Sequence, residues 1–134
     1  MATKARIEHI AVYVNDIEAE KEFFVKHFGA GVSEKYVNFR KDFTSYFLTF
    51  ADGSRLEIMN RTSMSDQPKT KYRSGFHHIA IEVGDRKDVD DATKRIEKAG
   101  LPVIDGARTT GDQYYASVVA DPEGNEIEII ARPA

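Results

Sequence analysis

The sequence predicts an α+β protein built from two tandem copies of one unit, a strand, a helix and three further strands (βαβββ). The first observation is a repeat: Glu-His-Ile-Ala-Val-Tyr-Val at residues 8–14 returns as His-His-Ile-Ala-Ile-Glu-Val at residues 77–83. The second is that the halves end alike, because Gly53 and Gly124 each stand four residues before a glutamate in a strand-like run. Such a repeat requires both copies to form the same elements in the same order.

The first copy opens with a strand over residues 8–14 and continues into a helix. Asp16 can cap this helix, apolar residues recur at helical spacing, and Gly29 ends it. β-Branched and aromatic residues then predict three strands, with a tight turn at Asp52 and Gly53 between the last two. The predicted strands are residues 32–39, 46–50 and 55–59.

The second copy repeats this order from a strand over residues 77–83. Its helix can be capped by Asp85 or Asp88, and Gly100 followed by Pro102 stops it. A turn at residues 121–124 separates the last two strands. The three predicted strands are residues 103–107, 114–120 and 126–131.

A polar segment with little periodicity, residues 61–74, joins the two copies. We therefore expect one domain over residues 1–134, with module one at residues 5–60 and module two at residues 75–132. A chain of 134 residues is long enough to bury an independent core.

The composition excludes several classes of function. The chain has no cysteine, so any metal must be held by nitrogen and oxygen, and disulfides and a catalytic thiol are excluded. With 19 basic and 22 acidic residues the formal charge is −3, which gives no general attraction to nucleic acid or anionic lipid. No apolar run approaches the roughly 20 residues that cross a bilayer. We expect a cytoplasmic protein without a nucleic-acid or membrane partner.

Four residues of the repeat point to a metal site. Successive side chains of a strand face opposite ways, so the apolar residues of each strand can lie under the helix while their neighbours face away from it. His9 and Glu57 lie on this second face in module one, and His78 and Glu128 lie there in module two. A half-solvated sheet would explain any one of them. Two equivalent imidazoles and two equivalent carboxylates instead predict a pseudo-twofold site for a divalent ion, with open positions for a substrate.

The motifs around these residues resemble the vicinal oxygen chelate superfamily, and look like its glyoxalase I (lactoylglutathione lyase) type. They are His-Ile-Ala-Val-Tyr-Val, Arg-Leu-Glu-Ile-Met, Gly-Phe-His-His-Ile-Ala-Ile-Glu-Val and Asp-Pro-Glu-Gly-Asn-Glu-Ile-Glu-Ile-Ile, and the resemblance spans residues 7–130. It implies metal ligands in the order His9, Glu57, His78, Glu128. It also implies two modules combined into an open mixed β-barrel around a cavity, commonly in a homodimer in which each site takes one module from each chain.

Within the superfamily, the fourth ligand favours the glyoxalase type. Ring-cleaving dioxygenases use two His and one Glu, methylmalonyl-CoA epimerases usually carry Gln at the position that matches Glu57, and bleomycin-binding members lack the metal set. The resemblance therefore implies a metal-dependent lyase or isomerase that acts on a small 2-oxoaldehyde–thiol hemithioacetal or a related vicinal-oxygen substrate. The alternatives are an epimerase or another metal-dependent reaction, and a non-catalytic module that sequesters a drug or toxin.

The chemistry expected at the site is a 1,2 proton shift. A divalent ion stabilises the negative charge that develops on two vicinal oxygens when one of the two carbons that carry them loses its proton, and a carboxylate accepts that proton and returns it to the other carbon. We expect Glu128 to be the principal base and Glu57 its near-equivalent. The metal is expected to be Zn or Ni, with Co, Mn and Fe as alternatives, because this ligand set accepts several ions.

Further residues are candidates for substrate contacts. Arg55 and Met59 share the predicted face of Glu57, and Tyr13 shares that of His9. Tyr114 and Tyr115 alternate across their strand, so one is expected to reach the cavity and the other the core; Tyr115 is our candidate. Among the other histidines, His77 is expected at the surface or beside the metal ligands, and His27 in the packing at the end of its helix.

Overall fold

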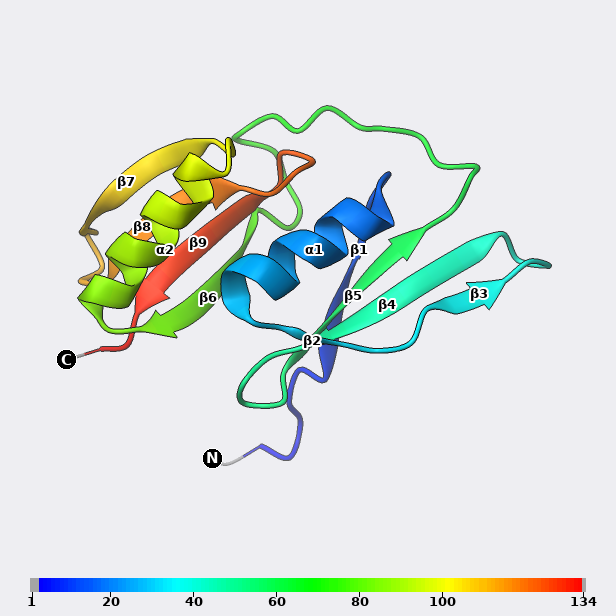
Figure 1. The fold of residues 1–134 in the computed structure, drawn as a ribbon, viewed down its shortest axis with the longest axis horizontal. Coiled ribbons are helices and arrows are strands. Elements are labelled where there is room, and N and C mark those ends of the chain that lie inside the picture. Colours follow the sequence, from blue (N-terminus) through cyan, green and yellow to red (C-terminus); the bar gives the residue numbers. More distant parts are fainter. Residues whose placement is uncertain (1–2, 134) are drawn as a thin grey trace. The chain divides into compact units, whose positions relative to one another are not determined.

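The structure is a computed structural model that describes residues 3–133 (Figure 1). The ends of the predicted domain, residues 1–2 and 134, lie outside the described residues. The chain divides between Asp66 and Gln67 into two compact units, module one and module two. In each unit a helix lies against one face of a sheet. Among the described residues, no helix is both long and apolar enough to cross a bilayer.

Module one is a mixed sheet covered by the helix α1. Its strands follow the order β1-β5-β4-β2, and β3 also pairs with β4. β1 runs parallel to β5, and the other pairs are antiparallel. The elements are β1 (His9–Tyr13), α1 (Ile17–Phe28), β2 (Gly31–Val32), β3 (Tyr36–Asn38), β4 (Phe43–Thr49) and β5 (Arg55–Asn60).

The ends of α1 follow from its flanking residues. The Asp16 carboxylate accepts the backbone N–H of Ala19 at 3.0 Å, which satisfies one of the free donors of the first turn. Gly29 ends the helix in the left-handed conformation, at φ 65°, where it has no Cβ to clash. The buried face of α1 and the facing strands form the core of the module, including Phe23, Phe24, Leu48, Leu56 and Ile58.

Module two repeats this architecture with a longer helix. Its sheet has the strand order β6-β9-β8-β7, again with one parallel pair, β6 with β9. Asp85 caps α2 and forms a capping box with Asp88, in which each side chain accepts the other residue's backbone N–H. The elements are β6 (His78–Gly84), α2 (Arg86–Lys98), β7 (Val103–Thr109), β8 (Tyr115–Ala120) and β9 (Glu126–Ala131).

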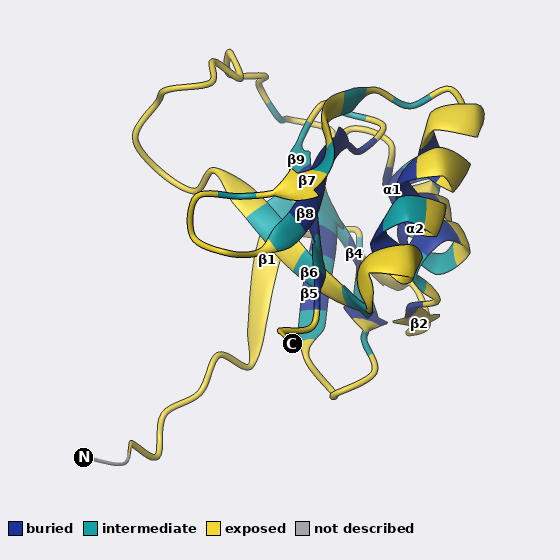
Figure 2. Ribbon diagram, turned by 90° about the vertical axis from the view of Figure 1, so that its left-hand side faces the viewer, coloured by how far each residue is buried: buried dark blue, intermediate teal, exposed yellow. Residues whose placement is uncertain are grey.

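The core of module two lies between α2 and the sheet, as the dark-blue segments in Figure 2 show. Val89 and Ile96 of the helix are fully buried, as are Ile127 and Ile129 of β9. One polar link crosses this core: the hydroxyl groups of Thr93 and Ser117 lie 2.7 Å apart, and Thr93 also donates to the carbonyl of Val89. Buried hydroxyl groups are tolerated because these bonds replace those to water.

The predicted α+β class and both helices are confirmed, but one predicted strand is not continuous. The segment 32–39 forms two short strands, β2 and β3. Between them Ser33 bonds β4 in a way that interrupts the regular ladder: its N–H donates to the carbonyl of Phe47, and its hydroxyl accepts the N–H of the same residue. Module one therefore carries one more short strand than the predicted unit.

Candidate metal-binding site

In module one, the parallel pairing of β1 and β5 brings His9 next to Glu57. His9 pairs with Arg55 and Ala11 pairs with Glu57, so these side chains share the face turned away from α1. The His9 Nε2 lies 3.8 Å from the Glu57 Oε1. Phe47, the partner of Glu57 on β4, meets the His9 ring edge-on with centroids 5.3 Å apart. Glu57 is the more enclosed of the two, with 15% of its side chain exposed against 38% for His9.

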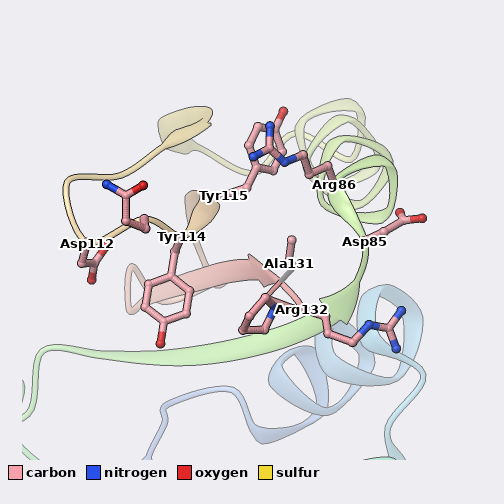
Figure 3. Close-up of a pocket in the computed structure, with 9 residues that line it drawn as sticks. Asp85, Arg86, Asp112, Tyr114, Tyr115, Ala131 and Arg132 are labelled. Carbon is pink, nitrogen blue, oxygen red and sulfur yellow. The ribbon is translucent and has the colours of Figure 1, made fainter.

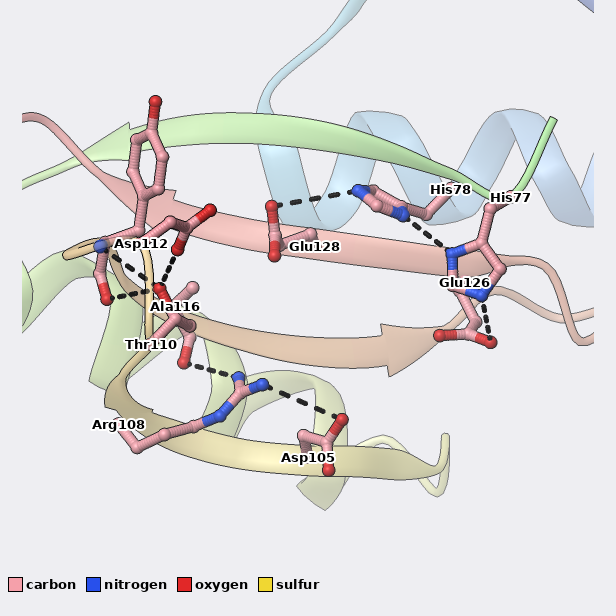
Figure 4. Close-up of polar contacts among 10 residues, drawn as sticks. His77, His78, Asp105, Arg108, Thr110, Asp112, Ala116, Glu126 and Glu128 are labelled. Carbon is pink, nitrogen blue, oxygen red and sulfur yellow. Dashed lines mark hydrogen bonds and ion pairs between the residues drawn. The ribbon is translucent and has the colours of Figure 1, made fainter. Parts of the chain in front are cut away.

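Module two reproduces the pair on β6 and β9. His78 pairs with Glu126 and Ala80 with Glu128, which repeats the register of module one. The His78 Nε2 lies 3.9 Å from the Glu128 Oε1 (Figure 4). The strand partner of Glu128 on β8 is Val118, so no aromatic ring stands where module one has Phe47. The two His–Glu pairs thus have nearly the same separation in different surroundings.

Each pair has donors that suit a divalent metal ion. Two atoms that bind one ion at about 2.0–2.2 Å can be at most about 4.4 Å apart, and both Nε2–Oε1 separations lie within this limit. The other ring nitrogen, Nδ1, is engaged elsewhere in both histidines, so Nε2 is the nitrogen turned to the carboxylate. Within residues 3–133, no three His, Asp or Glu side chains gather in a group that could hold an ion. Each module by itself therefore offers a pair of ligands.

The partners of Nδ1 differ between the modules. In module one, Glu8 Oε1 lies 3.3 Å from the His9 Nδ1 and also accepts from Arg55. The Arg55 guanidinium holds the pKa of the Glu8 carboxyl below its usual value, and His9 contributes in the same direction. In module two, His77 Nδ1 lies 2.8 Å from the His78 Nδ1, and His77 Nε2 lies 3.4 Å from Glu126.

Sequence reasoning predicted His77 at the surface or beside the metal ligands but did not single out Glu8 or Glu126. A signal for them was available. Glu8 and His77 stand at the same position of the repeat, directly before the histidine ligand, and Arg55 and Glu126 occupy the position opposite that histidine. Complementary residue types at both positions indicate paired contacts in each copy.

The family model of the Glyoxalase/Bleomycin resistance protein/Dioxygenase superfamily matches residues 6–129, which is nearly the whole chain. The chain belongs to this superfamily. The predicted resemblance is confirmed at that level, and the matched residues include all four predicted ligands.

The alignments with similar proteins span both modules of this chain. The chain is 25% identical to the uncharacterized protein YqjT of Bacillus subtilis, over 93% of this chain and 98% of that protein. It is 27% identical to a probable lactoylglutathione lyase of Vibrio cholerae, over 93% of this chain and 89% of the relative. Among solved structures, a glyoxylase/bleomycin resistance protein/dioxygenase domain from Frankia sp. EAN1pec aligns with a TM-score of 0.83 at 12% identity, over 98% of this chain and 94% of that one. The last likeness supports the fold alone.

Three of the predicted substrate contacts lie on the face of the module one sheet that is turned away from α1. Arg55 stacks on Phe47, with its guanidinium carbon 4.2 Å from the ring centroid, while it bonds Glu8. Met59 pairs with Tyr13 across β1 and β5. The Tyr13 hydroxyl accepts a hydrogen bond from Arg61 at 3.0 Å. These residues share the face of Glu57, and their contact with a substrate remains a prediction.

Tyr115, the fourth predicted contact, points to the opposite side of its sheet. Its hydroxyl donates to Asp90 of α2 at 2.6 Å, and the Arg86 guanidinium lies over its ring at 4.9 Å. The hydrogen bond to Asp90, with burial, raises the pKa of the Tyr115 phenol. Tyr115 therefore does not share the face of Glu128, and Tyr114 is the tyrosine that turns away from α2 (Figure 3).

Tyr115 instead lines a pocket of about 540 Å³ in module two. The pocket lies between the start of α2, the turn before β8 and the end of β9, and Figure 3 shows Tyr114, Arg86 and Ala131 around it. None of the four predicted metal ligands lines this pocket. A substrate role for Tyr115 stays a prediction, and this pocket is the surface through which it could act.

Proposed function

We propose that the protein is a metal-dependent lyase or isomerase of the glyoxalase I type, acting on a small 2-oxoaldehyde–thiol hemithioacetal or a related vicinal-oxygen substrate. The observation that carries the proposal is the equivalent geometry of two His–Glu pairs, with Nε2–Oε1 separations of 3.8 and 3.9 Å in the two modules. The relatives named lactoylglutathione lyase support the same reaction class. They are between 24% and 28% identical to this chain, which leaves the substrate to experiment.

His9, Glu57, His78 and Glu128 would hold one divalent ion, Zn or Ni first and Co, Mn or Fe as alternatives. The ion supplies Lewis-acid stabilisation of negative charge on adjacent substrate oxygens. Glu128 accepts the proton from the hydroxyl-bearing carbon next to the carbonyl and returns it to the carbonyl carbon, while the hydroxyl proton passes to the former carbonyl oxygen; Glu57 is the counterpart of Glu128 in module one. Arg55, Met59 and Tyr13 lie on the same face as Glu57 and would contact the rest of the substrate.

The two ligand pairs have to meet at one ion. We propose that they do so within one chain or across a homodimer in which each site takes one module from each subunit. The reaction needs no cysteine, and the protein would work on a freely diffusing small molecule in the cytoplasm. Sedimentation of the metal-loaded protein, with and without chelator, measures the assembly and tests the dimer.

Metal content and turnover on the methylglyoxal–glutathione adduct test the function together. Protein purified without chelator is expected to hold about one ion per chain, since each chain carries four ligands. It should lose activity on chelation and regain it with at least one of Ni, Zn, Co, Mn or Fe(II). The exposed helix residue Glu97 offers a control, because Glu97→Gln removes a carboxylate outside the site and should leave metal and turnover unchanged. Tight metal binding without turnover on this adduct would favour an epimerase or another reaction. A metal-free protein that still binds small molecules would favour sequestration.

A further inference from the structure

We infer that Glu126 and His77 form a relay that fixes the tautomer of His78. In this tautomer the Nε2 atom keeps the lone pair that would bind the metal. In this arrangement His77 and Glu126 are positioning residues and His78 is the ligand. The inference rests on the proposed function for the presence of an ion, but the tautomer of His78 can be measured without one. It concerns residues of module two alone, all of which lie in one compact unit.

The geometry of the relay is continuous from Glu126 to Glu128 (Figure 4). The Glu126 Oε2 lies 3.4 Å from the His77 Nε2, and the His77 Nδ1 lies 2.8 Å from the His78 Nδ1. The two imidazole rings meet edge-on, with an interplanar angle of 87°. On its far side, the His78 Nε2 faces the Glu128 Oε1 at 3.9 Å.

The direction of the hydrogen bond between the two rings follows from the carboxylate beside His77, which lies at ion-pair distance. Two imidazole nitrogens 2.8 Å apart form a bond only when one carries a hydrogen and the other a lone pair. An ionised carboxylate only accepts, so Glu126 favours a hydrogen on His77 Nε2 and leaves a lone pair on Nδ1 of the neutral ring. His78 Nδ1–H then donates to His77. The His78 Nε2 is left with its lone pair, which is the form that binds a metal.

Module one contains the same device in different residues. There Glu8 accepts directly at the His9 Nδ1, and Arg55 holds Glu8 in place. An acceptor directly before the ligand, and a residue opposite the ligand that fixes this acceptor, thus occur in both modules. The acceptor and its partner are matched within each module: a carboxylate with a guanidinium in one, and an imidazole with a carboxylate in the other.

The simpler interpretation is a solvent-exposed contact that contributes little. His77 has 42% of its side chain exposed, and exposed ion pairs contribute little to the stability of a protein. Glu126, however, is enclosed, with 19% of its side chain exposed, and stands directly beside Glu128 on the same face of β9. The two interpretations differ in what His77 does to His78, which is measurable.

The experiment compares two substitutions of His77. Gln can still accept at His78 Nδ1 with its carbonyl oxygen and turn its NH₂ to Glu126, whereas Phe can do neither. The measurements are the ¹⁵N chemical shifts of the imidazole nitrogens in the metal-free protein and metal affinity by competition with a chromogenic chelator. His77→Phe should lose the Nδ1–H form of His78 and weaken metal binding about 10–100-fold. His77→Gln should keep both within a few-fold, and thermal unfolding checks that each variant is folded.

A double substitution separates the relay from a general effect of charge. If Glu126 acts through His77, Glu126→Leu should weaken metal binding in the wild type and have little further effect in the His77→Phe background. Additive losses would overturn the relay, as would an unchanged His78 tautomer in His77→Phe. If both His77→Phe and His77→Gln bind fewer metal ions per chain than the wild type, His77 is itself a metal ligand, and this result would also overturn the relay. If the wild type binds no metal while the tautomer still depends on His77, the proposed function fails and the relay stands.

Discussion

The two modules share one feature of the candidate site and differ in nearly everything around it. The His–Glu separation is 3.8 Å in module one and 3.9 Å in module two, across the same register of parallel strands. Around it, module one has the ring of Phe47 and a carboxylate at the histidine, whereas module two has the smaller Val118 and a second imidazole. The comparison teaches that the separation of the two donors is the constrained quantity, since different contacts produce the same value.

The same comparison makes the two glutamates unequal. Glu57 faces Phe47 and has 15% of its side chain exposed, while Glu128 faces Val118 and has 25% exposed. A carboxylate that must move between an ion and a substrate carbon needs room, and a small neighbour leaves more of it than a ring. This difference favours Glu128 as the base.

The largest effect is expected from the glutamates. Glu128→Gln should lower turnover about 10²–10⁴-fold because the amide cannot accept the proton, and Glu57→Gln should lower it less. Steady-state kcat and KM on the methylglyoxal–glutathione adduct measure both, with metal content determined on the same samples. Equal losses would show that the modules are chemically equivalent despite their surroundings. Full activity in both variants would remove the proton-transfer role of these residues.

The next effect concerns the cores, where the modules are expected to behave alike. Ile58 and Ile129 occupy corresponding positions on β5 and β9, and both are fully buried. Truncation to Ala leaves a cavity in each and should lower the free energy of unfolding by about 2–5 kcal/mol. Denaturant unfolding measures the change, with the half-exposed Ile104→Ala as the control. If only one of the two substitutions lowers the free energy of unfolding, the sheet of the other module contributes little to cooperative folding.

The smallest effect is expected at the helix caps. Asp85→Ala should destabilise more than Asp16→Ala, because Asp85 takes part in a reciprocal capping box with Asp88, whereas the corresponding residue after Asp16 is Ala19, whose side chain cannot accept a hydrogen bond. Both shifts in melting temperature should be well below that of Ile129→Ala. The exposed loop residue Glu34 provides a control in Glu34→Ala. Equal shifts for the two caps would contradict a contribution from the Asp88 side chain.

The cap of module two also predicts a pH dependence. The backbone N–H of Asp88 donates to Asp85 and holds the pKa of that carboxyl below its usual value. The stabilisation is therefore present above the unfolded pKa of about 3.9 and is lost as the pH falls through the lower folded value. Melting temperatures measured through the acid range should fall less steeply for Asp85→Ala than for the wild type. A parallel fall would assign the acid sensitivity to other carboxylates.

The sequence was sufficient wherever a period or a cap carries the information. Period two along a strand placed His9 and Glu57 on one face, and the capping residues placed the helix starts at Asp16 and at Asp85 or Asp88, of which the structure shows Asp85 as the cap. It was insufficient where contacts between strands decide. Ser33 interrupts the strand predicted at 32–39 through bonds to β4. The face that Tyr115 takes depends on the register of β8 against β9, which sets Val118 and not Tyr115 on the face of Glu128.

The partners of the histidines show the same limit. Arg55 reaches Glu8, and Glu126 reaches His77, only because parallel pairing sets Arg55 opposite His9 and Glu126 opposite His78. Neither strand shows this pairing by itself. The two His–Glu pairs were predictable as residues of one face, but their separations were not. How the pairs combine at one ion is a proposal that rests on the resemblance and on equal geometry.

The parallel pairing of the first and last strands has a consequence for the order of events during folding. His9 and Glu57 stand near opposite ends of module one, as His78 and Glu128 do in module two, so neither donor pair exists until the intervening helix and hairpin have been laid down. Closing such a distant contact is a late and entropically costly step. An ion that requires both donors of a pair would thus bind only to a folded module, and its binding would then stabilise the pairing of the first and last strands.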